Sequence, residues 1–396
     1  MKSTPSSEIN NRLEALKLAM SAEEIDMAII VQKVDLFYFS GTAQDAHLLV
    51  PVDSDPELLV RKSLERALED SPIKRITATR SLSDIKDVAL GSGSARMKRV
   101  GLELDVLPVN NFRMYEKLFP HSEFVDISPM IRKLRSVKSA YEIDLMRKAA
   151  ELNDSMFAYA RQILRPGMVE MEFAGLLEAF LRKREHQGLV RVRSFNNEVF
   201  YGHIMAGVNL AVPSCSVGPT GGPGPNASMP QGAGTRVIRE NEPVQIDYVG
   251  SYKGYIVDQA RTFFIGQAGE EFLNVHDLAL KIQQAIMEKG KAGVVAESLY
   301  EMAVRMASEE GRLEGFMGYP QAVPFVGHGI GLELDELPIV GKKSFQILQE
   351  GMVIALEPKF ILPGKGLAGI ENSFVVGKHC LERLTKFGDQ IQIVNC

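Results

Sequence analysis

The chain has 396 residues, 45% hydrophobic and 24% charged, with a formal net charge of −5. This composition is typical of a globular protein long enough for two domains. The mild acidity argues against a nucleic-acid or anionic-membrane partner, and no stretch approaches the roughly 18 apolar residues of a membrane span. Cys215, Cys380 and Cys396 are few and widely spaced, so we expect no disulfide framework, no cysteine metal site and a reducing cytoplasm.

Short strand and helix patterns alternate in the first third of the chain. Alternation of this kind is typical of a small α/β domain. The predicted strands are 25–31, 46–52, 75–80 and 99–104, and a helix is predicted over 63–70.

A long amphipathic helix follows this domain. From Leu145 to Ile163, apolar residues recur at steps of three and four, which is the period of a helix face. Pro166 and Gly167 end the helix, and a second helix is predicted around 173–180. We place the boundary near residue 135, which gives domains of residues 1–135 and 136–396.

Residues 244–262, VQIDYVGSYKGYIVDQART, indicate a tight β-hairpin that carries two aspartates. With Tyr252 and Lys253 at its tip, Asp247 and Asp258 are predicted to lie directly opposite each other, with Cβ atoms roughly 4.5–5.5 Å apart. Like charges in that position destabilise a sheet unless a cation lies between them. The alternative is that both aspartates are solvated edge residues.

The same arrangement recurs in a second hairpin. Two apolar strands flank a turn centred on Gly364, which places Glu357 opposite Glu371. His328 lies between the two hairpins in the sequence, and the glycines on each side of it let backbone pass close to a site. Carboxylates with one imidazole suit Mn, Fe, Co or Zn, and four carboxylates can bridge two ions about 3.5–4 Å apart.

With these hairpins and the GHGIG loop at 327–331, the chain resembles the metallopeptidase family of prolidase, aminopeptidase P, methionine aminopeptidase and creatinase. IRKLRSVKSAYEIDLMRKAA and RPGMVEMEFA are similar to the start of the catalytic domain in the prolidase and creatinase branch, and VDLFYFSG to an element of its N-terminal domain. The resemblance covers nearly the whole chain. It implies an α/β (α+β) fold, in which a creatinase-like N-terminal α/β domain precedes a catalytic domain with the pita-bread fold.

Carried over position by position, the resemblance implies five metal ligands. Family members use two divalent ions, commonly Mn, Co, Zn or Fe, bridged by a water or hydroxide that attacks the scissile carbonyl. A glutamate at the position of Glu357 handles the proton, and homodimers are usual in this branch. The implied ligands are Asp247, Asp258, His328, Glu357 and Glu371.

Two histidines that the family uses beside the metals are missing. Asp335 stands where one is expected, and Ser214 or Gln231 takes the place of the other. Because an ionised aspartate only accepts hydrogen bonds, we hypothesise that Asp335 binds a cationic part of a different substrate. His203 could supply the missing imidazole, with a purely structural histidine as the alternative.

We therefore expect a cytoplasmic, homodimeric, metal-dependent hydrolase that cleaves a small peptide or amide bond, with Xaa-Pro peptides as the first guess. Two alternatives stay open. One is non-peptidase chemistry on the same fold, such as creatinase-like C–N hydrolysis or a lyase reaction, which the missing histidines would suit. The other is a non-catalytic binding protein, against which the presence of all five ligand positions argues. The catalytic candidates are Glu357, His203 and Asp335.

Overall fold

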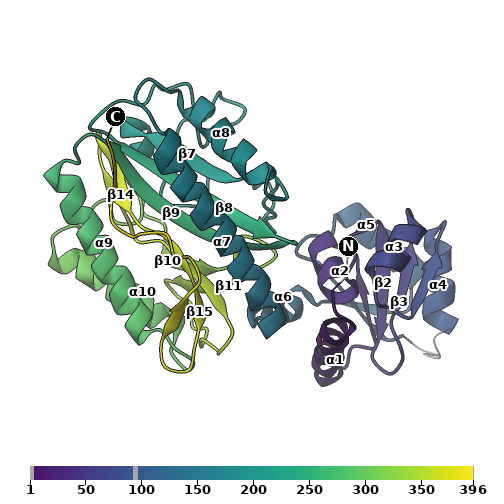
Figure 1. The fold of residues 1–396 in the computed structure, drawn as a ribbon. Helices are drawn as coiled ribbons and strands as arrows, with labels where there is room; N and C mark the ends of the chain where they lie inside the picture. Colours follow the sequence, from purple (N-terminus) through teal and green to yellow (C-terminus); the bar gives the residue numbers. More distant parts are fainter. Residues whose placement is uncertain (1–3, 92–96, 396) are drawn as a thin grey trace. The chain divides into compact units, whose positions relative to one another are not determined.

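The structure, a computed structural model, describes residues 4–91 and 97–395. The chain forms two compact units, Met1–Arg135 and Ser136–Cys396 (Figure 1). Both units mix helices and strands, as predicted. Within the two described ranges, no helix combines the length and the apolar character that crossing a membrane requires.

The N-terminal unit is built on one six-stranded sheet with the order β4-β3-β2-β1-β5-β6. The strand pairs β1–β2 and β2–β3 are antiparallel, and the remaining neighbours are parallel. The four predicted strands are present with slightly shorter bounds, and the sheet contains two further strands, β3 and β6, that were not predicted. The strands are β1 (Met27–Ile30), β2 (Ala46–Pro51), β3 (Glu57–Val60), β4 (Arg75–Ala78), β5 (Arg99–Leu102) and β6 (Glu123–Asp126).

Helices complete the core of this unit. Met27, Leu49 and Val100 of the sheet belong to the same buried apolar cluster as Tyr115 of α5. Burial of such side chains stabilises each by roughly 1.5–3 kcal/mol relative to exposure. The helices are α1 (Ser6–Ala22), α2 (Lys33–Ser40), α3 (Leu64–Asp70), α4 (Leu82–Gly91), α5 (Val109–Leu118) and α6 (Ser128–Ser136).

The C-terminal unit contains a four-stranded sheet, β17-β9-β8-β7, a five-stranded sheet, β11-β10-β12-β15-β16, and the pair β13-β14. An isolated bridge between Ala260 and Glu371 connects β9 to the segment that precedes β15. The strands are β7 (Gly202–Ala206), β8 (Pro243–Tyr252), β9 (Tyr255–Ile265), β10 (Phe325–Gly329), β11 (Glu336–Gly341), β12 (Val353–Leu356), β13 (Lys359–Leu362), β14 (Gly366–Gly369), β15 (Asn372–Val376), β16 (Leu381–Arg383) and β17 (Gln392–Val394).

Two pairs of helices cover these strands (Figure 1). Phe157 of α7 and Phe173 of α8 share a buried cluster with Phe263 of β9. Ile282 of α9 and Leu299 of α10 share another with strands β10, β12 and β15. The helices are α7 (Ala140–Ile163), which the sequence pattern predicts, α8 (Glu170–Arg182), α9 (Glu270–Lys289) and α10 (Ala296–Glu309). The strands thus form an inner layer in which the candidate site residues lie.

The first aspartate hairpin forms, but its predicted register is wrong. Asp247 lies opposite Ala260 and Asp258 opposite Val249, so the two aspartates are diagonal neighbours on one face. The tip is Lys253 and Gly254, with φ of 48° and 92°. A two-residue turn with positive φ at both central positions favours glycine at the second, which shifts the tip one residue from the predicted Tyr252 and Lys253. Diagonal neighbours lie about 7–8 Å apart, which leaves room for a cation between the carboxylates.

The register predicted for the second hairpin is confirmed. Lys359 lies opposite Gly369 in the β13–β14 pair, and Leu356 lies opposite Asn372 in the β12–β15 pair. Glu357 and Glu371 fall between these two pairs, in the same register. The two glutamates therefore lie on facing segments between the β12–β15 pair and the β13–β14 pair, and both are buried.

Candidate metal centre

All seven residues singled out from the sequence as ligands or catalytic groups line one cavity of about 80 Å³ in the C-terminal unit. Its wall is formed by strands β7, β8, β9 and β10, by the ends of β11, β12 and β15, and by the loop at 216–220. The candidate residues on the cavity wall are His203, Asp247, Asp258, His328, Asp335, Glu357 and Glu371.

His328 lies on β10, which pairs with β11 on one side and with β12 on the other. A Cβ atom at Gly327 would lie 2.4 Å from the oxygen of Ala355, and one at Gly329 would lie 2.2 Å from the oxygen of Leu337. The glycines thus permit close strand packing around the histidine. Its Nδ1 lies 3.1 Å from the Gly329 oxygen, which can only accept, so Nδ1 carries the proton and Nε2 is available as a metal ligand.

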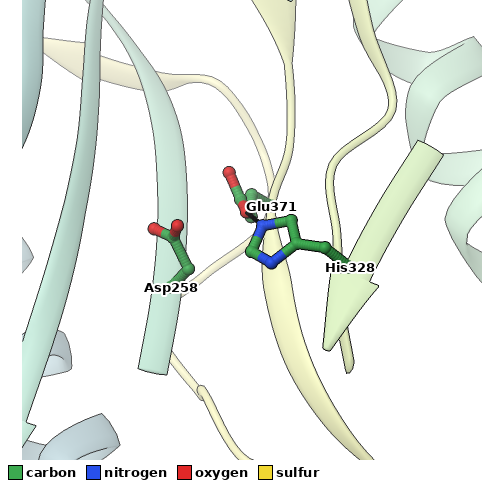
Figure 2. Close-up of side chains that lie close together, drawn as sticks. All are labelled: Asp258, His328 and Glu371. Atoms are coloured by element: carbon green, nitrogen blue, oxygen red, sulfur yellow. Dashed lines mark ion pairs between the residues drawn. The ribbon is translucent and has the colours of Figure 1, made fainter. Parts of the chain in front are cut away.

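Asp258, His328 and Glu371 lie close together and form a compact set of possible metal ligands (Figure 2). One ligand atom from each lies within 4.8 Å of the others, and all three residues are buried. The Oε1 atom of Glu371 is 3.8 Å from His328 Nε2 and has no hydrogen-bond partner. A buried carboxylate oxygen without a partner is costly, and a bound cation would remove that cost. The donor set therefore fits a divalent metal ion.

Lys359, on β13, points its ammonium group into the same cluster. Its Nζ lies 2.6 Å from Asp247 Oδ2, 2.9 Å from Glu357 Oε2 and 2.7 Å from Glu371 Oε2. The lysine side chain is 1% exposed. Its three N–H donors thus meet three carboxylates of the ligand set implied by the resemblance.

The pKa directions show a site with more negative than positive charge. Burial, with Glu371 and Asp247, raises the pKa of Asp258 well above its ordinary value. Burial likewise raises the pKa of Glu371, although Lys359 acts in the opposite direction. Burial lowers the pKa of Lys359, but the carboxylates beside it more than offset this and raise it well above its ordinary value. The carboxylates thus need further positive charge beyond that of the lysine.

Arg261 braces the segment that carries Glu371. Its guanidinium donates to the backbone oxygens of Glu371 and Ala260, each at 2.8 Å, and to Oδ1 of Asn372 at 2.8 Å. Arg261 is fully buried, and burial lowers its pKa to about 9. This network fixes the backbone of a ligand residue without contacting the cavity itself.

His203 lies on β7 directly opposite Asp247. Burial lowers the pKa of His203, whereas Asp247 raises it, and the net direction is downward. Gln231 lines a neighbouring pocket of about 240 Å³ together with His203, whereas Ser214 lines neither cavity. The structure therefore places Gln231, of the two positions considered for the missing family histidine, beside the imidazole.

Asp335 stands on the far side of His328 from Glu371. Its Oδ1 is 3.8 Å from His328 Nδ1, and its side chain is about one-third exposed at the cavity. The neighbouring Glu336 is used differently, since it accepts from the backbone N–H of Leu332 and from Nζ of Lys138. Asp335 thus offers a carboxylate that a bound substrate can reach.

Lys359 is a site residue that was not predicted from the sequence. A signal for it was present, because side chains two apart on a strand share a face and Lys359 follows Glu357 by two. A lysine in an otherwise apolar strand, on the face of a buried carboxylate, predicts an internal ion pair.

His186 supports the strand that carries Asp247 and yields a pH prediction. Its Nε2 donates to the Val249 oxygen at 2.9 Å and its Nδ1 accepts from the Gly188 N–H at 3.0 Å, an arrangement that needs a neutral ring. Burial lowers its pKa from 6.5 to about 4. Because the pKa of His186 is lower in the folded chain than in the unfolded chain, protonation of this ring favours unfolding. The stability that the neutral ring contributes is therefore fully present above pH 6.5 and is lost as the pH falls toward 4.

We expect the protonation of His186 to lower the free energy of unfolding by about 2 kcal/mol when the pH is decreased from 7.5 to 5. The measurement is urea unfolding of the wild type and of His186→Gln at both pH values. The variant should lose less stability than the wild type on acidification. An equal loss in both proteins would refute the assignment.

Comparison with known proteins identifies the family. Metallopeptidase family M24 matches residues 144–378, and the creatinase/prolidase N-terminal domain matches residues 12–137. The chain is 26% identical to an Xaa-Pro dipeptidase of Pyrococcus furiosus, over 96% of this chain and 98% of that protein. Among solved structures, it is similar to an X-Pro aminopeptidase of Thermotoga maritima (TM-score 0.80, 25% identity, 96% and 99% coverage) and to the prolidase of Pyrococcus furiosus (TM-score 0.75, 26% identity, 93% and 99% coverage).

The chain belongs to metallopeptidase family M24. The predicted fold class, an N-terminal creatinase-type domain followed by a pita-bread domain, is confirmed. The prediction of a metal-dependent hydrolase of the peptidase class is confirmed as well, and the family implies divalent metal ions. The donor set of Asp258, His328 and Glu371 is compatible with such an ion.

Proposed function

We propose that this chain hydrolyses small peptides with an Xaa-Pro bond, at a metal centre built from Asp247, Asp258, His328, Glu357 and Glu371. The observation that carries the proposal is the buried, unpartnered Oε1 of Glu371 beside Asp258 and His328. The named activities of the Pyrococcus and Thermotoga relatives support the substrate class. The comparisons do not favour the creatinase-like, lyase or non-catalytic alternatives.

A divalent ion, when bound, supplies Lewis acidity toward a carbonyl oxygen and lowers the pKa of a coordinated water. Asp258, His328 and Glu371 would hold it, and this mixture of carboxylate and imidazole suits Mn, Fe, Co or Zn. The resemblance implies two ions, which the four carboxylates could serve. The contacts of Lys359 favour one ion instead.

We assign the acid–base and hydrogen-bonding roles to two residues on the cavity wall. His203, neutral because its pKa is lowered, can donate an N–H to the oxygen of a tetrahedral intermediate. Glu357 lies on the same wall and is the proposed proton carrier between the attacking water and the leaving amine. Arg261 fixes the backbone of Glu371 and Lys359 holds the carboxylates, and neither is assigned a role at the reacting atoms.

The test is a hydrolysis assay on matched dipeptides, Ala-Pro and Ala-Ala, with protein loaded with Mn, Co, Zn or Fe. We expect turnover of Ala-Pro that chelation abolishes and metal restores, and a much lower rate on Ala-Ala. Failure on every Xaa-Pro peptide, together with turnover of a non-peptide C–N substrate such as creatine, would contradict the proposal and support the creatinase-like alternative.

Asp335 is proposed to bind a cationic part of the substrate, such as a free amino terminus. A charge-assisted hydrogen bond contributes about 1.5–3 kcal/mol, so Asp335→Asn should raise KM by roughly 10–150-fold with a smaller effect on kcat. Steady-state kinetics on Ala-Pro and on N-acetyl-Ala-Pro check this, because the acetylated peptide lacks the cation. Unchanged turnover of Ala-Pro by the variant would end the hypothesis.

We also propose a cytoplasmic location and a homodimer. Cys215 and Cys380 are exposed free thiols, which supports a reducing compartment. Phe195 is 92% exposed and Phe200 is 56% exposed, within one segment of the C-terminal unit, and such apolar side chains suit an interface with a second copy. Light scattering on the purified chain tests the dimer.

A further inference from the structure

We infer that Lys359 is a built-in cation that takes the place of one of two metal ions, so that the chain binds one divalent ion, at Asp258, His328 and Glu371. The inference rests on the proposed metal centre and specifies how its positive charge is supplied. It departs from the pair of ions that the resemblance implies.

The ammonium group of Lys359 fills the position that a metal ion would take among Asp247, Glu357 and Glu371. Its three donors meet Asp247, Glu357 and Glu371 at 2.6, 2.9 and 2.7 Å, so each N–H has a carboxylate oxygen. A metal ion in this position would need the same oxygens. It would also have to expel a buried charged side chain, which would then lack partners.

The backbone holds Lys359 in this place. β13 pairs with β14 at Lys359 and Gly369, and the Lys359 oxygen accepts from the N–H of Met317 at 3.0 Å. Gly369 has no Cβ, and a Cβ there would lie 2.7 Å from the Lys359 Cα. Lys359 follows Glu357 by two residues and its Nζ lies 2.9 Å from Glu357 Oε2, so the pairing of β13 with β14 holds the ammonium beside the carboxylates.

Glu371 divides its two oxygens between two cation positions. Its Oε2 accepts from Lys359, whereas its Oε1 has no hydrogen-bond partner and faces His328 Nε2 at 3.8 Å. Asp258 and His328 complete the donors around Oε1, and Asp258 has no ion pair with the lysine among the contacts described. One position is thus filled by the protein, and the other has the ligands of a single metal ion.

Because Lys359 supplies one positive charge, the site needs fewer metal ions from solution to offset its carboxylates. Part of the positive charge that offsets four carboxylates is permanent and does not depend on the supply of metal. The carboxylates of Asp247 and Glu357 are held in place by the ammonium before an ion binds. Chelation should accordingly remove one ion and leave the cluster partly neutralised.

The test compares the wild type with Lys359→Ala and Lys359→Met, with Lys365→Ala as the matched control. Lys365 lies at the turn of the same hairpin, is exposed, and pairs with Glu271 away from the cavity. Each protein is stripped with chelator, loaded with Mn²⁺ and freed of excess ion. Metal per chain is then measured by elemental analysis, and the electron paramagnetic resonance spectrum distinguishes isolated Mn²⁺ from a coupled pair.

We expect one isolated ion in the wild type and in Lys365→Ala, and two coupled ions in a folded Lys359 variant. Two ions in the wild type would overturn the inference while leaving the proposed function intact. One ion in both the wild type and the folded Lys359 variants would also overturn it. No ion in any protein would overturn the proposed metal centre itself. If Lys359→Ala does not fold, Lys359→Met, which keeps most of the side-chain volume, decides.

Discussion

Replacing His328 by Ala is expected to abolish metal retention and hydrolysis together. In the proposed centre His328 Nε2 is the imidazole ligand, and its Nδ1 donates to the Gly329 oxygen. Changes in residues that merely support metal ligands cost roughly 10–100-fold in affinity or activity, so loss of a ligand should cost more. Metal content after desalting and kcat/KM on Ala-Pro measure both effects.

The control for this variant is His379→Ala, because His379 is exposed and lies outside the cavity. It should retain metal and activity like the wild type. A His328→Ala protein that is folded, keeps its metal and hydrolyses Ala-Pro at the wild-type rate would contradict the assignment of His328 as a ligand.

Lys359→Met is expected to destabilise the metal-free protein by about 3–5 kcal/mol. Removal of the ammonium leaves Asp247, Glu357 and Glu371 facing one another without a buried cation. Unfolding in urea, followed by circular dichroism because the chain has no tryptophan, gives the change in the free energy of unfolding. Added Mn²⁺ should restore part of the loss, since a ligand that binds only the folded state stabilises it.

Lys365→Met serves as the control, because Lys365 is exposed and its surface ion pair should contribute no more than about 1 kcal/mol. If Lys359→Met were as stable as this control without metal, the ammonium would not be needed to offset the carboxylates. The account of the cluster would then be wrong.

The sequence predicted correctly which residues would share the site, but it predicted their relative positions less well. Glu357 and Glu371 were placed correctly because a turn at Gly364 fixes the register on both sides. Asp247 and Asp258 were predicted to be directly opposite, which is wrong, since the positive φ of Lys253 and Gly254 moves the turn by one residue. The aspartates still share a face because a shift of the turn by one residue changes the opposed partner by two.

Other features lay beyond sequence patterns. His203 meets Asp247 only through the β7–β8 pairing, which joins strands far apart in the sequence. The braces that Arg261 forms reach segments more than one hundred residues away. Lys359 could have been predicted from its spacing to Glu357, but its contact with Asp247 depends on the association of separate sheets.

The most direct test of the metal centre is anomalous diffraction from a crystal of the wild-type chain loaded with Mn²⁺. The account predicts an anomalous peak within coordination distance of Asp258, His328 and Glu371, with Lys359 still bound to Asp247. Data from a fully loaded, catalytically active crystal that show no peak among these three residues would contradict it.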